Sequence, residues 1–295
     1  MFWKAFNKGL ICRGKQYKEN TVYEEEGGNI CSPGMMHFCD EPFNVLNYYN
    51  LVDEHGEIPE FATVESLEAP VRREDKLASK KIKIGNEVSF YQFINAGIRH
   101  LIAKTKHEPD CNCIGNDAPG QNIASSYNDV QIGNSGYAAH ISNSGMCAII
   151  GNDSECSSIS NSGHSAQICD AGYASRIANA GNKSRIASDG KYANISTSGD
   201  GCRIASFGEE SQITSSGEFS MINMQGDNSV AVCVGFHSAI KGKIGCWITL
   251  AEWHSVGDGK WVPVCVKTGK IDGKELLPDT WYRLKNGEFT KIEEN

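Results

Sequence analysis

Three cysteines and one histidine near the start of the chain belong to residue types that commonly bind zinc. They are Cys12, Cys31, His37 and Cys39. Thiolate and imidazole groups suit a tetrahedral Zn²⁺ ion. Their spacing lacks the close ligand pairs of a standard zinc finger or ribbon, and buried thiols beside a core histidine give the same pattern. We therefore predict no metal and no cofactor, and a zinc site at these four residues stays open as the alternative.

Arg13, His37, Tyr48 and Tyr49 suggest a second kind of chemistry. An early Arg-Gly pair, a strand with a histidine and a helix with tyrosines resemble small NAD-consuming ADP-ribosyltransferases. The Glu-x-Glu pair that this resemblance implies is missing, since Glu24–Glu26 lie in an acidic turn. The chain also has no P-loop, dinucleotide fingerprint or nucleophile elbow. We expect no enzyme, with an ADP-ribosyltransferase-like N-terminal domain as the alternative.

A nine-residue period dominates the middle of the chain. Its consensus is Gly-x-x-[Ser/Ala]-x-Ile-[small]-[Asn/Ser]-x, and it recurs over fourteen copies without a slip. Ser154 replaces one glycine, and Ala231 replaces one isoleucine. A fixed short period is the signature of one structural unit stacked on itself.

Nine residues suit one short strand and one turn. Strand side chains alternate between faces, so each Ile and the small residue two positions before it point the same way. The glycine is expected to supply a positive φ in the turn. Stacked units then bring the isoleucines together about 4.8 Å apart in one apolar core. We predict a β-solenoid over residues 123–244, with two nonapeptides per coil preferred over three because the core is thin.

The flanking segments differ from the repeats. Residues 1–105 predict a small α+β domain that ends in an amphipathic helix, because apolar residues recur at helical spacing from Phe90 to Ile102. Residues 106–122 are polar and rich in turn formers, which indicates a linker. Residues 245–295 predict β-strands with hairpin turns at Asp258-Gly259 and Asn286-Gly287. We expect this segment, with its four tryptophans, to cap the solenoid.

Composition narrows the class of protein. The formal net charge is −8, which disfavours generic nucleic-acid binding. No stretch of about 18 apolar residues is present to span a membrane, and the N-terminus has no apolar run that suits a signal peptide. The repeats also lack the recurrent Asp of calcium-binding nonapeptides. We expect a cytoplasmic protein with reduced cysteines.

Three segments resemble an uncharacterised family of bacteriophages and prophages. They are Cys-Arg-Gly-Lys-Gln-Tyr from Cys12, Met-His-Phe-Cys followed by Pro-Phe-Asn-Val-Leu-Asn-Tyr-Tyr from Met36, and Pro-Asp-Thr-Trp-Tyr from Pro278. Met36 stands where the family usually has Phe. The resemblance covers nearly the whole chain and implies a phage or prophage origin, with no activity attached.

The residue before each Ile should point outward and form a ladder suited to recognition. The candidate binding face consists of Gln167, Arg185, Arg203 and Met221 in one row, with Arg176 in the row of the opposite sheet. We predict a non-catalytic interaction protein that binds a host or phage protein, with inhibition of a bacterial defence complex as one use. The alternative is a virion- or tail-associated, adhesin-like structural protein in which the roll forms a homo-oligomer.

Overall fold

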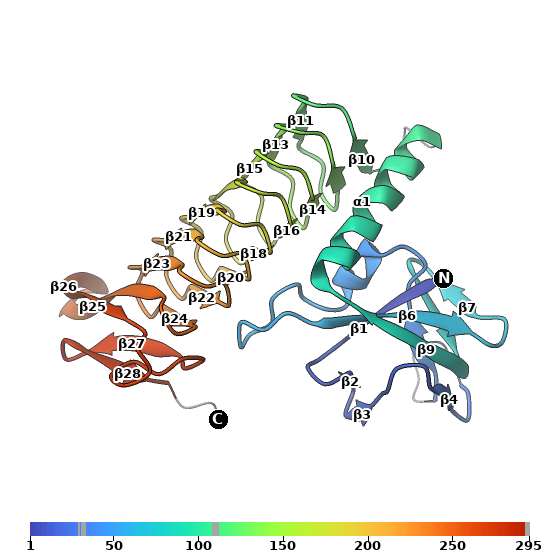
Figure 1. Cartoon of the computed structure of the whole chain (residues 1–295), viewed down its shortest axis with the longest axis horizontal. Helices are drawn as coiled ribbons and strands as arrows, with labels where there is room; N and C mark the ends of the chain where they lie inside the picture. Colours follow the sequence, from blue (N-terminus) through green and yellow to red (C-terminus); the bar gives the residue numbers. More distant parts are fainter. Residues whose placement is uncertain (29, 31–33, 108–111, 293–295) are drawn as a thin grey trace.

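The computed structural model describes residues 1–28, 30, 34–107 and 112–292. The chain is mainly β, and a β-solenoid of about eight turns over residues 113–250 forms its long axis, as predicted. Figure 1 shows the N-terminal region beside one flank of the solenoid and the C-terminal strands at its far end. These three parts were expected from the sequence, and the contacts between the first two were not.

Two sheets, whose strands run parallel up to the C-terminal hairpins, form the walls of the solenoid. The first, here called the covered sheet, continues into the C-terminal strands and contains β10 (Cys113–Asn116), β12 (Gln131–Asn134), β14 (Ile149–Asn152), β16 (Gln167–Asp170), β18 (Arg185–Ser188), β20 (Arg203–Ser206), β22 (Met221–Met224) and β24 (Ala239–Gly242). The second, the open sheet, contains β11 (Asn122–Ser125), β13 (His140–Asn143), β15 (Ser158–Asn161), β17 (Arg176–Asn179), β19 (Asn194–Thr197), β21 (Gln212–Ser215), β23 (Val230–Cys233), β25 (Trp247–Gly257) and β26 (Lys260–Lys270).

The strand register confirms two nonapeptides per coil. Ile132 pairs with Ile150 in the covered sheet, and Ile141 pairs with Ile159 in the open sheet, so a coil takes 18 residues. Strand β10 already forms the first rung, within the 106–122 segment that the sequence assigned to a linker. The repeats before Ile123 are less regular in sequence, which is why the period alone placed the start of the solenoid later.

The isoleucines form one continuous core, as expected. Ile132, Ile168 and Ile204 have no exposed surface, and the same cluster runs on to Ile240 and Ile248 at the far end. The small residues two positions earlier also lie inside, since Ser175, Ser184 and Ala193 are fully buried. Their small size lets the two sheets approach each other.

The role predicted for the repeat glycines is wrong. They do not have positive φ; the left-handed position lies two residues later and, apart from Gly201, is held by non-glycine residues such as Lys183 and Tyr192. Glycine is needed because the coils touch at this corner. A Cβ on Gly181 would lie 1.9 Å from the carbonyl oxygen of Gly163 in the previous coil. Ser154, the exception, donates its hydroxyl to the Gly136 carbonyl over 2.8 Å.

A ladder of polar side chains inside the solenoid was not expected from the sequence. The last residue of each strand points inward like the Ile two positions before it. In the open sheet, Asn143 donates its side-chain amide to Asn161 over 2.8 Å, and Asn161 donates to Asn179 over 2.7 Å. Each amide also donates to a corner carbonyl, as Asn161 does to Gly163. The buried amides are therefore satisfied without water.

Asp170 interrupts the equivalent ladder of the covered sheet. Its carboxyl accepts from Asn152 on one side over 2.8 Å and from the Ser188 hydroxyl on the other over 3.0 Å. The ladder therefore reverses direction at this rung. Burial raises the pKa of Asp170 to about 6, although these hydrogen bonds partly offset the rise.

The N-terminal region contains two small antiparallel sheets and one long helix. The strands are β1 (Phe2–Phe6), β6 (Glu60–Ser66), β9 (Lys81–Val88) and β4 (Val22–Glu24) in one sheet, β5 (Met36–Phe38), β8 (Lys76–Ser79) and β7 (Val71–Arg73) in the other, and the hairpin of β2 (Ile11–Cys12) and β3 (Lys15–Gln16). The predicted amphipathic helix is α1 (Phe90–His107), and the segment after Pro42 forms the 3₁₀ helix η1 (Phe43–Asn47).

The C-terminal strands contain both predicted hairpins. Strands β25 and β26 pair across Asp258-Gly259, and β27 (Tyr282–Lys285) pairs with β28 (Glu288–Lys291) across Asn286-Gly287. The expectation that tryptophans close the core is only partly correct. Trp281 is buried, but Trp247 and Trp261 are exposed, and the end of the core is covered by Ile271, Leu276, Tyr282 and Leu284 instead.

The N-terminal region is packed onto the covered sheet through a column of small residues. These follow the Ile of each strand and point outward, beginning with Gly115, Gly133 and Gly151. A Cβ on Gly115 would lie 2.4 Å from Cα of Ile102 in α1, and one on Gly151 would lie 2.7 Å from the ring of Phe43. One apolar cluster therefore runs from η1 and α1 into the outer face of the solenoid.

We predict that Gly199→Ala destabilises the solenoid, because the added Cβ would lie 2.2 Å from the Gly181 carbonyl. The expected loss of unfolding free energy is about 2 kcal/mol or more, which is typical of strain at a packed position. The neighbouring exposed Ser198→Ala is the control and should cost about 0.5 kcal/mol or less. Urea unfolding followed by circular dichroism measures both. Equal costs for the two variants would show that the corner has room for a side chain.

We predict that Asp170→Asn stabilises the protein at pH 7. An aspartate whose folded pKa is raised binds more protons in the folded state, so stability falls as pH rises from about 4 to about 6. An asparagine removes this pH dependence, so the free energy of unfolding should rise by up to roughly 3 kcal/mol at pH 7. The difference should vanish near pH 4. Exposed Asp227→Asn is the control. Thermal unfolding at several pH values measures the effect, and a gain independent of pH would contradict this explanation.

Candidate functional site

A pocket in the N-terminal region collects most of the chemically active residues found in the sequence. It has a volume of about 550 Å³ and is lined from β1, the β2–β3 hairpin, β5, the end of η1 and β8. We call it the basic pocket. Its lining includes Lys4, Cys12, Arg13, Lys15, His37, Cys39, Tyr48, Tyr49 and Lys76. The Arg-Gly, His and Tyr-Tyr motifs, separate in the sequence, therefore meet in one place.

The β2–β3 hairpin contributes Cys12, Arg13 and Lys15 to the lining of the basic pocket. Cys12 pairs with Lys15, and the two residues between them, Arg13 and Gly14, both have positive φ, as a tight two-residue hairpin turn requires. Glycine takes this conformation without cost, which accounts for Gly14, whereas Arg13 adopts it as a non-glycine residue. Arg13 is exposed and forms no hydrogen bond or ion pair within the described ranges.

Lys4 is the most unusual charge of the pocket. It is 5% exposed, and it donates to the backbone carbonyl of His37 over 2.9 Å and to Sγ of Cys12 over 3.4 Å. Neither partner is a carboxylate. Burial lowers the pKa of Lys4, because the charged form loses hydration. Cys12 also accepts a hydrogen bond from the hydroxyl of Tyr49 over 2.8 Å.

Positive charge predominates around His37. Burial is the main reason that the pKa of His37 is lowered, and the charges of Arg13, Lys76 and Lys4 lower it further. The one acidic residue of the lining, Glu25, forms an ion pair with Lys15. Lys76 lies over the ring of Tyr48, 5.1 Å from its centroid. The pocket is thus cationic within a chain whose net charge is −8.

The zinc hypothesis receives no support from the described residues. Within them, no group of three or more His, Cys, Asp or Glu side chains is placed to hold a metal ion. Cys31 lies outside the described residues. Burial raises the pKa of the Cys39 thiol to about 12, which disfavours the thiolate that zinc requires. His37 directs Nε2 to the backbone carbonyl of Ile30.

The predicted binding row of the solenoid lies on the covered sheet, beside the chain's own N-terminal region. Gln167 accepts from the amide of Leu51 over 2.8 Å and donates to the carbonyl of Leu46 over 2.8 Å. Arg185 donates to the carbonyl of Val52. The register confirms that these two stack in one row with Arg203 and Met221, which are half-buried. Gln167 and Arg185 are therefore held by the N-terminal region, and Arg203 donates to the Phe219 carbonyl of the solenoid over 2.8 Å.

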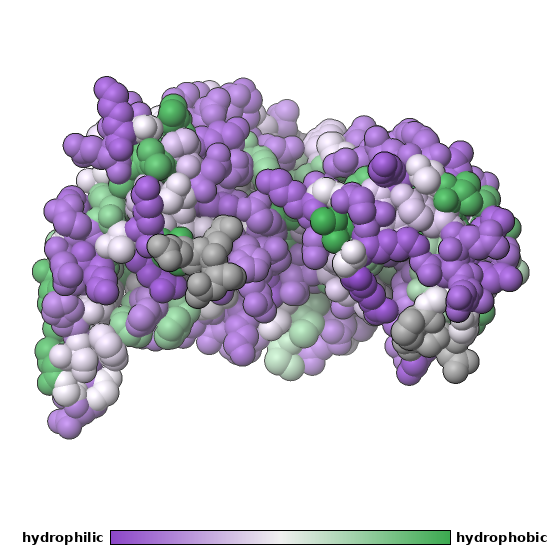
Figure 2. Space-filling model, turned by 90° about the horizontal axis from the view of Figure 1, so that it is seen from below, coloured by the Kyte–Doolittle hydropathy of each residue, from purple (hydrophilic) through white to green (hydrophobic). Residues whose placement is uncertain are grey.

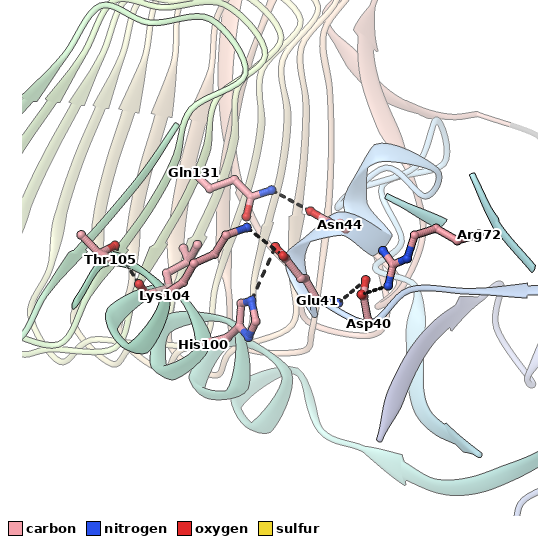
Figure 3. A network of polar contacts seen from close by, with 9 residues as sticks. Asp40, Glu41, Asn44, Arg72, His100, Lys104, Thr105 and Gln131 are labelled. Atoms are coloured by element: carbon pink, nitrogen blue, oxygen red, sulfur yellow. Dashed lines mark hydrogen bonds and ion pairs between the residues drawn. The ribbon is translucent and has the colours of Figure 1, made fainter. Parts of the chain in front are cut away.

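A second set of polar contacts fixes η1 and α1 beside the solenoid. Figure 3 shows Glu41 between Lys104 and His100 of α1, and Gln131 of the solenoid donating to Asn44. The carboxylate of Glu41 lies 2.7 Å from Lys104 Nζ and 3.5 Å from His100 Nε2. The hydrogen bond from Gln131 to Asn44 is 2.8 Å long. His100 and Lys104 lower the pKa of Glu41 to about 2.

The outer face of the open sheet is not covered by the described part of the chain. Arg176 is exposed there and stacks between Ser158 and Asn194. Beside this row runs a shallow groove of about 740 Å³ with a floor of small side chains, among them Ser142, Ser160, Ala178 and Ser196. These residues occupy the same repeat position as the glycine column of the covered sheet.

Lys4, Lys15 and Lys76 were not predicted from the sequence to be members of one site. Isolated lysines in short strands carry no periodic signal, so only the tertiary structure brings them together. The uncovered groove had a signal that was readable in the sequence. Alternate nonapeptides differ after the Ile, with Gly133 and Gly151 in one sheet and Ser142 and Ser160 in the other.

Comparison with known proteins identifies one domain. A family model described as a domain of unknown function (DUF7666) matches residues 1–96, which include the whole lining of the basic pocket. No curated protein and no solved structure matches the chain. Among the described residues, none of the helices has both the length and the apolar character needed to cross a membrane.

We predict that Gln167→Ala weakens the docking of the N-terminal region. The substitution leaves the Leu51 amide and the Leu46 carbonyl without partners, at a cost of about 1–3 kcal/mol. Gln212→Ala is the matched control, because Gln212 has the same repeat position on the open sheet and is exposed. Hydrogen exchange at the Leu51 amide and urea unfolding measure the effect. Equal behaviour of the two variants would show that these contacts do not hold the region in place.

Proposed function

We propose that this chain is a non-catalytic interaction protein that binds a protein partner through the outer face of the open sheet. The observation that supports this is the asymmetry of the solenoid. The chain's own η1 and α1 are packed on the small-residue column of the covered sheet. The equivalent column of the open sheet lines a groove that the described part of the chain does not cover.

The chemistry of the groove suits a helix or an extended segment of a partner. Small side chains such as Ser160 and Ala178 allow a close backbone approach, as the glycine column allows α1 on the opposite sheet. The adjoining row runs, from coil to coil, through His140, Ser158, Arg176, Asn194 and Gln212. Arg176 is its charged member, and His140 is its titratable one. Rigid solenoid faces of this kind commonly serve as recognition surfaces.

The setting of this interaction is part of the proposal. The resemblance of the terminal segments to phage and prophage proteins supports a host or phage protein as the partner, in the cytoplasm of a bacterial host. Inhibition of a defence complex is one such use. The N-terminal region then serves as a fixed module on the covered sheet, while the open sheet is available to the partner.

Ala178→Arg tests this proposal, because a long charged side chain would fill the groove. Immobilised wild-type protein is expected to retain a specific host protein from lysate, and Ala178→Arg is expected to lose it. Ala174→Arg, at a corner outside the groove, is the control. The interaction is then reproduced with the purified partner by calorimetry. Recovery of the same proteins by all three forms would contradict the choice of this surface.

A second candidate is a virion-associated structural protein that self-associates. One observation favours it: β26 is an edge strand with exposed Val262, Val264 and Val266. Figure 2 shows apolar side chains at the end of the molecule where this hairpin lies. The molar mass in solution distinguishes the two candidates. A stable oligomer, dissociated by the substitutions Val264→Lys and Val266→Lys, would favour the structural protein. A monomer would exclude it.

A further inference from the structure

We infer that the basic pocket is a binding site for a small phosphate-bearing ligand with an aromatic base, such as a nucleotide. This inference concerns the N-terminal region and does not depend on the open sheet. It also does not require a reaction at the bound ligand. It rests on the charge, the walls and the size of the pocket.

Most of the positively charged side chains that line the pocket have no carboxylate partner among the described residues. Lys15 and Glu25 form a pair, so three cationic side chains are left without a carboxylate: Lys4, Arg13 and Lys76. Lys4 uses its hydrogen bonds on a carbonyl and a sulfur, and Arg13 has no partner in the described ranges. Cations brought together on one concave surface repel each other, and an anion removes that cost. Phosphate fits, because Arg binds it with two parallel hydrogen bonds and Lys binds it as a point charge.

The remaining walls suit an aromatic ring. Trp3, Tyr17 and Tyr49 line the same pocket, together with the apolar side chains of Met36 and Val45. Aromatic side chains stack on the faces of nucleobases and stabilise them without reading their sequence. The volume of about 550 Å³ lies within the range of pockets that bind small ligands and cofactors.

His37 and Cys12 give the site two reporters. Three nearby cations lower the pKa of His37, so a bound anion should raise it again. Cys12 lies half-buried in the pocket, whereas Cys147 and Cys156 are exposed on the solenoid. A ligand in the pocket should therefore shield the sulfur of Cys12 and leave the other two accessible.

The full-length protein is titrated with ADP, NAD⁺ and inorganic pyrophosphate by calorimetry. We expect ADP or NAD⁺ to bind more tightly than pyrophosphate, since only the first two offer a base to the aromatic wall. Arg13→Gln and Lys76→Gln should each weaken binding about tenfold, the usual effect of losing a charged hydrogen bond. Arg176→Gln, on the open sheet, should leave binding unchanged.

A second measurement uses the unmodified chain. Alkylation by iodoacetamide is followed by mass spectrometry at each cysteine, with and without ADP. Slower alkylation of Cys12 alone, with unchanged rates at Cys147 and Cys156, is the expected result. Absence of binding by all three ligands, or binding that neither Arg13→Gln nor Lys76→Gln weakens, would overturn the inference. Pyrophosphate binding as tight as ADP binding would overturn the role given to the aromatic wall.

Discussion

The stacking of one coil directly on the next, in an 18-residue register, is the constraint on which the rest of the structure depends. A single coil has one large apolar residue per sheet and cannot exclude water from it, whereas stacked coils bury each Ile between its neighbours. Each fully buried Ile contributes roughly 1.5–3 kcal/mol. The same register brings the corner glycines into contact, so the backbone of one coil limits the side chain of the next. Core and corner are therefore two consequences of one spacing.

The register also makes a polar interior possible. The last residue of each strand points into the solenoid and stacks on the equivalent residue of the next coil. The side-chain amide of Asn161, for example, donates to that of Asn179 and to the carbonyl of Gly163 at the adjacent corner. Along the asparagine rungs, identical groups in identical positions satisfy one another. Asp170 differs from the asparagines because an ionised carboxylate can only accept hydrogen bonds. The neighbouring rungs, Asn152 and Ser188, therefore both donate to it.

The two outer faces of the solenoid are used differently, although their backbones are alike. Glycines on the covered sheet allow α1 and Phe43 to approach the strands, and Gln131, Gln167 and Arg185 add polar contacts at the same boundary. This docking fixes the N-terminal region, with its basic pocket, on a rigid support. The open sheet keeps a groove of small polar residues. Among the described residues, the basic pocket and the open-sheet groove therefore lie on separate parts of the chain.

The sequence by itself determined the solenoid, its two nonapeptides per coil, the burial of its isoleucines, the helix after Phe90 and both C-terminal hairpins. These features follow from local rules: the alternation of a strand, the period of a helix and the geometry of a tight turn. It also predicted the row of Gln167, Arg185, Arg203 and Met221 correctly as a row. The tertiary structure alone decided what that row faces, because long-range packing of residues 43–57 has no period in the sequence. It likewise gave the glycines their role and assembled Lys4, Arg13 and Lys76 in one pocket, since contacts between distant strands depend on how whole elements are packed.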